Sequence, residues 1–220
     1  MTLTAEPATL INVCEIKHDG LKRAFDILFS LFALLLTGPF LLLLGVLVTL
    51  TSSGHAIYGH RRVGRGGKAF RCYKFRTMYL DADKRLELLL ASDPLLKEEW
   101  DKNHKLKNDP RVTPLGKFLR KTSLDEFPQF WNVLKGDLSI VGPRPVVYQE
   151  LTKFYGEQAS HVLSVRPGLT GPWQISGRSN VSYAERVRMD VDYVNNRNFL
   201  LDLTIIIKTI PAMLSSRGAY

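Results

Sequence analysis

An uncharged apolar segment, Ile27–Leu50, constrains the fold of this chain more than any other feature. It exceeds the roughly 20 apolar residues that a helix needs to cross a bilayer, so it predicts a membrane-embedded helix. A secretory signal peptide is the poorer interpretation. The segment lacks a small-residue cleavage site at its end, and its apolar core is longer than a signal peptide needs. The remainder of the chain therefore lies beside a membrane.

Two features of this segment favour a helix that enters the membrane and returns. Gly38-Pro39 falls near its centre, where proline removes a backbone donor and clashes with the preceding turn. Both flanks are basic, and the positive-inside rule directs basic flanks to the cytoplasm. A kinked helix that spans the membrane is the alternative, because membrane helices tolerate proline. The flanking cations are Lys17, Lys22 and Arg23 before the segment, and Arg61, Arg62, Arg65 and Lys68 after it.

This reasoning divides the chain into three parts. Residues 1–20 form an N-terminal tail, residues 21–51 a re-entrant membrane helix hairpin, and residues 52–220 a cytoplasmic domain that rests on the membrane. At the start of the hairpin, Lys22 and Asp26 stand four residues apart, so we expect them to pair on one helix face. Such a pair would lower the cost of a carboxylate near the membrane surface.

The chain is basic, with 30 Lys and Arg against 21 Asp and Glu and a formal charge of +9, which indicates an anionic partner. The densest basic region covers the loop 61–68 and the run 71–76. Because this region directly follows the apolar segment, lipid headgroups or a pyrophosphate fit it better than nucleic acid does. We expect no nucleic-acid partner.

The pattern downstream predicts a mostly α fold with minor strands, in the α+β sense. Short strands are expected at Ala56–Tyr58 and Ala69–Phe75. Helices are expected from amphipathic spacing, the last of them apolar enough to lie on the membrane surface. These helices are Asp81–Ser92, Pro94–Lys107, Leu115–Leu134 with Pro128 interrupting it, Ser182–Tyr193 and Phe199–Ile207.

The run 121–126 (KTSLDE) allows two compatible interpretations. Ser123 followed by Glu126 has the spacing of a capping box, which predicts a helix start. Carboxylates in a first helical turn feel the positive end of the helix dipole, which would lower the pKa of Asp125 and keep it ionised. An ionised Asp suits covalent phosphoryl transfer, and a neighbouring Glu suits a divalent cation. Arg120, one turn upstream, could neutralise phosphate charge.

Arg144 stands between two prolines in Gly142-Pro143-Arg144-Pro145. Proline fixes its own φ and restricts the residue before it, so this arginine is held rigidly. A guanidinium in a fixed pose suits bidentate binding of a phosphate. A purely structural turn is the alternative.

Several motifs follow one another in a fixed order. They are Lys22-Arg23 with Asp26, the proline-broken apolar segment, 74–78 (KFRTM), 122–126 (TSLDE), 132–139 (NVLKGDLS), 141–145 (VGPRP) and 166–171 (RPGLTG). From about Lys22 to its C-terminus the chain therefore resembles the bacterial sugar transferases, monotopic polyprenyl-phosphate hexose-1-phosphate transferases. Three further pieces, 105–113 (KLKNDPRVT), Gly177-Arg178 and 216–220 (SRGAY), make it most similar to short exopolysaccharide-priming enzymes for galactose or glucose.

The resemblance implies an enzyme at the cytoplasmic face of the bacterial inner membrane. It would transfer hexose-1-phosphate from a UDP-hexose to polyprenyl (undecaprenyl) phosphate and release UMP. Asp125 would be the nucleophile and Glu126 a ligand of Mg²⁺, the one cofactor expected. The other residues implied to line the site are Arg120 and Arg144 with catalytic roles, and Lys74, Arg76, Arg178 and Asp190 with substrate-binding roles.

Three points stay open at this stage. The family's helix break is often Ser-Pro, whereas this chain has Gly38-Pro39, so the bend is retained but the serine hydroxyl is not. Membrane lipid is an expected partner, and a homodimer is left open. A non-catalytic membrane adaptor, whose basic face binds anionic lipid, is the alternative function.

Overall fold

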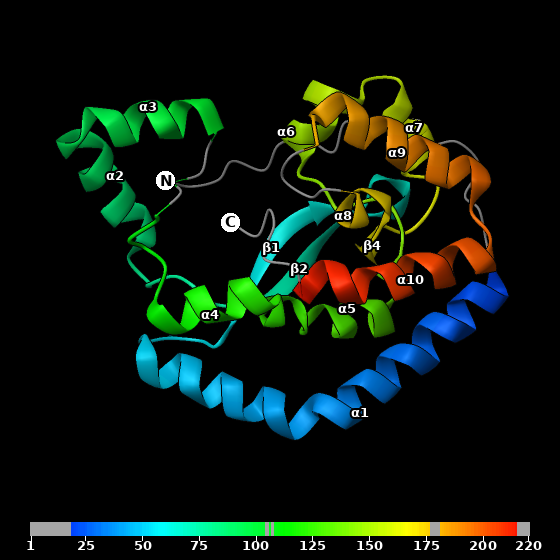
Figure 1. Ribbon diagram of the computed structural model, residues 1–220, viewed down its shortest axis with the longest axis horizontal. Coiled ribbons are helices and arrows are strands. Elements are labelled where there is room, and N and C mark those ends of the chain that lie inside the picture. The colour runs from blue at the N-terminus through cyan, green and yellow to red at the C-terminus, as the bar shows by residue number, and fades with distance from the viewer. Residues whose placement is uncertain (1–18, 104–105, 107, 177–180, 215–220) are drawn as a thin grey trace.

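The structure is a computed structural model that describes residues 19–103, 106, 108–176 and 181–214. Its long segments are helical and its strands are short, which confirms the predicted mostly helical class (Figure 1). The helices are α1 Gly20–Thr51, α2 Ala82–Ser92, α3 Pro94–Asn103, α4 Pro114–Thr122, α5 Gln129–Lys135, α6 Tyr148–Glu150, α7 Gln158–Val162, α8 Pro172–Ile175, α9 Tyr183–Asn196 and α10 Phe199–Leu214. The strands are β1 Ile57–Val63, β2 Ala69–Phe75, β3 Ser139–Val141 and β4 Gly168–Thr170, and short helical turns are η1 Arg65–Gly67, η2 Leu124–Glu126 and η3 Leu151–Tyr155.

Two small sheets organise the centre of the domain. β1 and β2 form an antiparallel hairpin in which Tyr58 pairs with Lys74, His60 with Cys72 and Arg62 with Phe70. The first strand is longer than predicted, since it continues through the arginines that were assigned to a loop. β3 and β4 pair in parallel, as chain segments far apart in sequence.

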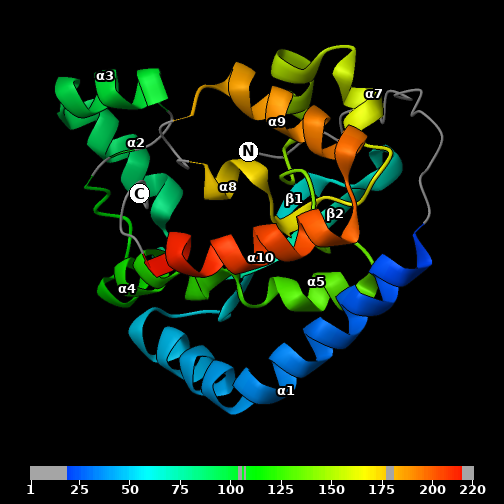
Figure 2. The same cartoon turned by 45° about the vertical axis from the view of Figure 1, so that its right-hand side comes forward.

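The central apolar core joins the hairpin to three helices. Buried Cys72 of β2 packs with Phe130 and Val133 of α5, Val194 of α9 and Ile205 of α10. A second cluster gathers under η3 and α7, and a third lies between β2, α4 and the end of α1. Figure 2 shows α1 along the outer side of the molecule; α1 packs on α5, which in turn contacts β2.

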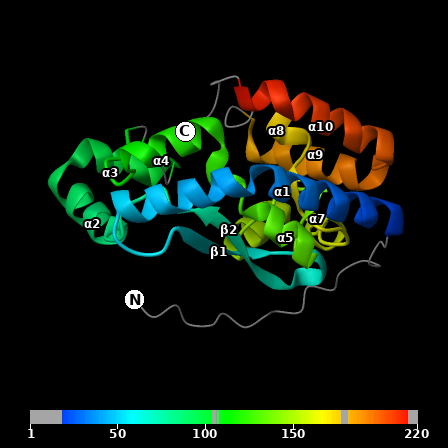
Figure 3. The ribbon, with the colours of Figure 1, turned by 90° about the horizontal axis from the view of Figure 1, so that it is seen from below.

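Helix α1 is continuous through Pro39 and is bent, so it is one bent helix and not two helices with a break. Both arms of the bend rise toward the rest of the molecule in Figure 1, and Figure 3 shows the helix crossing one face of the domain. Its buried residues, Asp26, Ser30, Leu44 and Val48, lie toward its two ends. Thirteen apolar side chains of α1 are exposed: Leu21, Ile27, Leu28, Leu31, Phe32, Leu35, Leu36, Phe40, Leu42, Leu43, Val46, Leu47 and Leu50.

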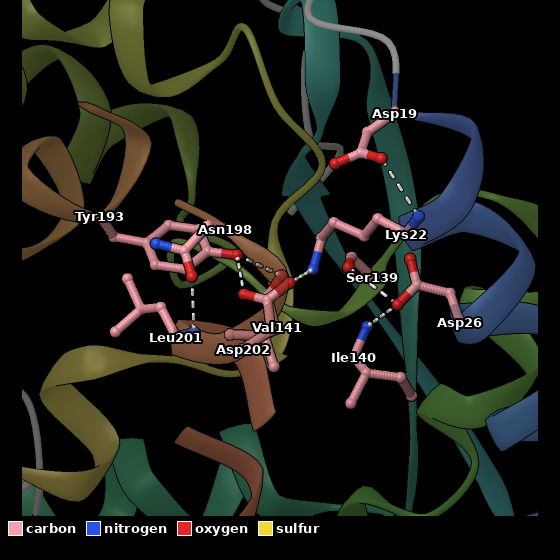
Figure 4. A network of polar contacts seen from close by, with 10 residues as sticks. All are labelled: Asp19, Lys22, Asp26, Ser139, Ile140, Val141, Tyr193, Asn198, Leu201 and Asp202. Atoms are coloured by element: carbon pink, nitrogen blue, oxygen red, sulfur yellow. Dashed lines mark hydrogen bonds and ion pairs between the residues drawn. The ribbon is translucent and has the colours of Figure 1, made fainter. Parts of the chain in front are cut away.

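The first arm of α1 is anchored by polar contacts (Figure 4). Lys22 Nζ lies 2.5 Å from Asp202 Oδ2 of α10, whose other oxygen accepts a 2.7 Å hydrogen bond from Tyr193. Asp26 accepts hydrogen bonds from Ser139 Oγ and the Ile140 amide, each 3.0 Å long. The predicted Lys22–Asp26 side-chain pair is therefore wrong, because each partner has a tertiary contact within the domain.

The second arm of α1 is anchored on the opposite side of the domain. Leu44 and Val48 pack against Phe75 and Leu119. Just beyond the helix end, the Arg76 guanidinium donates to the backbone carbonyls of Ser52, Ser53 and Gly54. Both arms of one 32-residue helix thus dock on one domain.

Other helices also have boundaries that differ from those predicted. The stretch expected as one interrupted helix over Leu115–Leu134 is α4, η2 and α5, because the chain turns at Ser123 and Pro128. α9 and α10 extend beyond the predicted ends. Among the described residues α1 is the one helix long and apolar enough to cross a membrane by length and composition.

Candidate active site

The turn between α4 and α5 presents the two adjacent carboxylates. Ser123 adopts a left-handed conformation with φ 57°, and its backbone N–H donates to carbonyls at the end of α4. It is therefore a helix C-cap, and its side chain makes no capping hydrogen bond to η2. The predicted Ser123–Glu126 capping box is wrong. The sharp reversal at Ser123 instead places Asp125 and Glu126 on a single 3₁₀ turn beside β2.

Asp125 is a buried carboxyl group, with 12% of its side chain exposed. Burial raises its pKa to about 6; Lys74 lowers it, Glu126 raises it and Arg120 lowers it. The dipole argument, which predicted a lowered pKa, is wrong here, because loss of solvation outweighs the contribution of a three-residue turn. A carboxyl group that titrates near neutral pH in such surroundings is a candidate for chemistry.

Lys74 and Glu126 complete the immediate surroundings of Asp125. Lys74 Nζ lies 2.5 Å from Glu126 Oε1 and 4.0 Å from Asp125 Oδ2. Glu126 is more accessible, with 36% of its side chain exposed. The structure therefore brings together three of the residues implied by the resemblance, from β2 and from η2.

Arg120 lies on the other side of Asp125, at the end of α4. Its Nε donates to Thr77 Oγ1 over 2.9 Å, and its pKa is lowered by burial although Asp125 and Asp109 both raise it. Gly116 makes this packing achievable, since a Cβ there would lie 2.0 Å from the Thr77 carbonyl oxygen. The close approach of α4 to the chain at Thr77 thus sets the position of Arg120.

Whether these residues suit a magnesium ion can be judged from their chemistry. Within the described ranges no group of three or more His, Cys, Asp and Glu side chains is placed to hold a metal. Mg²⁺ often needs only one or two protein carboxylates, because substrate phosphates and waters fill its remaining positions. Glu126 and Asp125 fit that mode of binding.

A second cluster surrounds Arg144. Its guanidinium lies over the Trp173 ring at 4.9 Å, and Arg186 lies over the same ring at 4.7 Å. Nearby, Arg62 Nη1 lies 3.4 Å from Glu150 Oε2, while Tyr183 donates to the other Glu150 oxygen over 2.6 Å. The pKa of Arg62 is lowered by burial and then by the adjacent charge of Arg144.

Asp190 lies beneath this cluster and is fully buried at 0% exposure. Its Oδ2 accepts a 2.8 Å hydrogen bond from Tyr155, whereas its Oδ1 is buried without a hydrogen-bond partner in the described structure. Burial raises its pKa to about 7, although the Tyr155 hydrogen bond and the charges of Arg144 and Arg186 lower it. Its substrate-binding role stays a prediction.

One face of the hairpin connects the two clusters. Lys74, Cys72, His60 and Arg62 share that face, because paired residues and every second residue along a strand point the same way. Arg62 was not predicted as a site residue. The alternation of β1 could have identified it, had the strand been recognised as continuing past residue 58.

Two other predicted residues stand apart. All three acceptors of the Arg76 guanidinium are carbonyls after α1, so it stabilises the connection between α1 and the hairpin; its role toward substrate stays a prediction. Arg178 lies outside the described residues.

Known proteins resemble this chain over most of its length. The family model described as "Bacterial sugar transferase" matches residues 17–216. The chain is 51% identical over 199 residues to the "Exopolysaccharide production protein ExoY" of Sinorhizobium fredii, covering 90% of this chain and 88% of that protein.

Two further relatives are longer proteins. The "Undecaprenyl-phosphate galactose phosphotransferase" of Salmonella typhimurium is 50% identical over 209 residues, which is 95% of this chain and 44% of the relative. The "UDP-galactose-lipid carrier transferase" of Erwinia amylovora is 48% identical over 206 residues, with 93% and 43% coverage. The chain thus spans less than half the length of these two relatives.

Proposed function

The chain belongs to the bacterial sugar transferase family, and from that premise we propose that it transfers hexose-1-phosphate from a UDP-hexose to polyprenyl phosphate. The observation that carries the proposal is the buried Asp125 carboxyl group, flanked by Lys74, Glu126 and Arg120. Relatives named for galactose phosphate transfer to a lipid carrier support the substrate class.

In the first step, an Asp125 carboxylate oxygen attacks the sugar-linked phosphorus of the UDP-hexose. The bond from that phosphorus to the bridging oxygen breaks, UMP leaves with the bonding electrons, and a phosphosugar remains on Asp125. The pKa of about 6 leaves the carboxylate largely ionised at neutral pH and still basic enough to be a good nucleophile. Lys74 and Arg120 offset the charge on the transferred phosphoryl group.

A magnesium ion would be held by Glu126, with help from Asp125. When bound, such an ion neutralises phosphate charge during phosphoryl transfer. Lys74 now contacts the Glu126 oxygen that a metal would use. We expect Lys74 to turn toward phosphate when the ion is present.

In the second step, a phosphate oxygen of the polyprenyl carrier attacks the phosphorus of the adduct. The bond to Asp125 breaks, the free carboxylate returns and a polyprenyl diphosphate hexose is released. One phosphoanhydride replaces another, so the reaction needs no ATP. Asp125 acts as a nucleophile in the first step and as the leaving group in the second, so it must be ionised before the donor is attacked.

The membrane arrangement is part of the proposal. The bent α1 would dip into the cytoplasmic leaflet with its exposed apolar side chains in lipid and return at Ser52. Its docking on one domain at both ends supports a re-entrant path, because a spanning helix would carry one end to the other side of the bilayer. The polyprenyl phosphate would then reach the site along the membrane face.

The direct test is turnover by the purified full chain in lipid nanodiscs. We expect labelled UDP-glucose or UDP-galactose and polyprenyl phosphate to give a labelled lipid and UMP. A screen that includes the N-acetyl forms identifies the hexose. Binding of anionic lipid without turnover of any donor would instead support the membrane adaptor.

A further inference from the structure

The guanidinium of Arg144 is held ready for an anion. Its backbone is restricted by Pro143 and Pro145 on either side. Its side chain stacks on Trp173, and among the described residues no carboxylate lies within 4.0 Å of it. An arginine loses side-chain entropy when a ligand fixes its orientation. Because the Arg144 side chain is already stacked on Trp173, less entropy is lost when a ligand binds.

A second guanidinium lies close to the first. Arg62, which is half-buried on β1, reaches the same group of side chains, because its partner Glu150 accepts from Tyr183, and Arg186 lies over both the Tyr183 ring and the Trp173 ring that Arg144 covers. The nearby Arg144 charge also lowers the pKa of Arg62. Within the described chain Glu150 is the one carboxylate within 4.0 Å of Arg62, and Glu150 also accepts from Tyr183. The two arginines thus have one carboxylate near them, Glu150, which pairs with Arg62. Two partly buried guanidinium groups with a single negative partner are suited to phosphate, whose oxygens accept paired N–H donors from each.

The position of Arg62 and Arg144 relative to Asp125 indicates which phosphate group of the substrate they bind. Arg62 and Lys74 project from the same hairpin face on opposite sides of Cys72. Lys74 pairs with Tyr58, so the two are separated by the four residue steps from Tyr58 to Arg62 along β1. At about 3.3 Å per residue, this separation is on the order of 13 Å between backbones, and long side chains shorten it. That span matches a diphosphate with one phosphate at Asp125 and the next toward Arg62.

Phosphoryl transfer places the attacking and leaving oxygens in line through phosphorus. In the first step UMP leaves from the position opposite Asp125. In the second step the acceptor must attack from that same position, because Asp125 is then the leaving group. We propose that Arg62 and Arg144 form one phosphate subsite that binds the UMP phosphate in the first step and the polyprenyl phosphate in the second.

This inference rests on the proposed function. Because one subsite would bind both phosphates, replacing Arg62 should weaken the binding of both ligands. Arg62→Ala should weaken UMP binding about tenfold to a hundredfold while leaving uridine binding within about twofold. The same variant should raise the KM for a short-chain polyprenyl phosphate by a similar factor. In the wild type, UMP should compete with polyprenyl phosphate, and uridine should not.

The experiment uses the full chain in nanodiscs, with calorimetric binding of UMP and uridine as one arm and acceptor KM at saturating UDP-hexose as the other. Arg61→Ala is the matched control, since Arg61 is exposed on the opposite face of the same strand. Arg62→Lys, which keeps the charge and the stem, serves if Arg62→Ala unfolds, and should lose at least threefold in both arms.

Loss in both arms for Arg62 variants, with Arg61→Ala unchanged, supports the shared subsite. An effect confined to one ligand would overturn it, as would an equal effect of Arg61→Ala, which indicates general surface charge. The calorimetric arm measures UMP binding directly, so it tests the subsite even if the enzyme turns over no donor. Wild type without turnover on any donor would count against the proposed function itself.

Discussion

The Lys74 ammonium lies 4.0 Å from the Asp125 carboxylate, and burial raises the pKa of Asp125 to about 6 in spite of the lowering effect of this charge. Asp125 must be ionised to attack phosphorus, so kcat/KM should fall as the pH drops below about 6. Lys74→Met removes the lowering charge and should move the acid limb of the pH profile to higher pH.

The measurement is kcat/KM against pH for both proteins. Lys117→Met is the control, because Lys117 is an exposed cation on the neighbouring helix α4. An acid limb that stays in place in Lys74→Met would show that the Lys74 charge does not act on the nucleophile.

Glu126→Gln tests the magnesium ligand. The amide keeps the size of the side chain but loses the charge that attracts a hard cation, so activity should fall by at least about tenfold. Raising the magnesium concentration should restore part of that loss in Glu126→Gln. Titration of activity with Mg²⁺ is the measurement, and an unchanged Mg²⁺ dependence in this variant would exclude Glu126 as a ligand.

The path of α1 can be tested by chemical labelling from outside intact spheroplasts. Single cysteines replace Thr4 or Ser53 in a Cys14→Ser background, in which the remaining Cys72 is buried. With a re-entrant α1, a membrane-impermeant maleimide should label neither site until the membrane is permeabilised. Labelling of the Thr4 replacement alone in intact spheroplasts would mean that the helix spans the membrane.

Gly116→Ala tests the packing that sets Arg120. A Cβ at this position would lie 2.0 Å from the Thr77 carbonyl oxygen, so α4 or the chain at Thr77 must move. We expect a loss of about 1–3 kcal/mol in the free energy of unfolding, measured by denaturation in detergent, together with lower activity. Gly20→Ala should leave stability nearly unchanged, since no atom lies within 4 Å of the added group.

The sequence predicted the fold class, the long apolar helix and the proximity of Lys74, Asp125, Glu126 and Arg120, because these depend on apolar length and on motif order. It could not predict the C-cap at Ser123, since the Ser-x-x-Glu spacing fits a helix start as well as a helix end. It also missed the tertiary partner of Lys22, because Asp202 is 180 positions away in the chain. Arg62 was missed because a basic run in a strand looks like a loop.

The central claim is that Asp125 forms a covalent adduct, and Asp125→Asn tests it most directly. Brief incubation of the wild type with labelled UDP-hexose alone should leave a hydroxylamine-sensitive phosphosugar on Asp125. Asp125→Asn should keep the wild-type melting temperature, form no adduct and retain less than roughly a thousandth of wild-type turnover, because an amide does not replace the carboxylate nucleophile. An Asp125→Asn enzyme with substantial turnover would contradict the covalent mechanism.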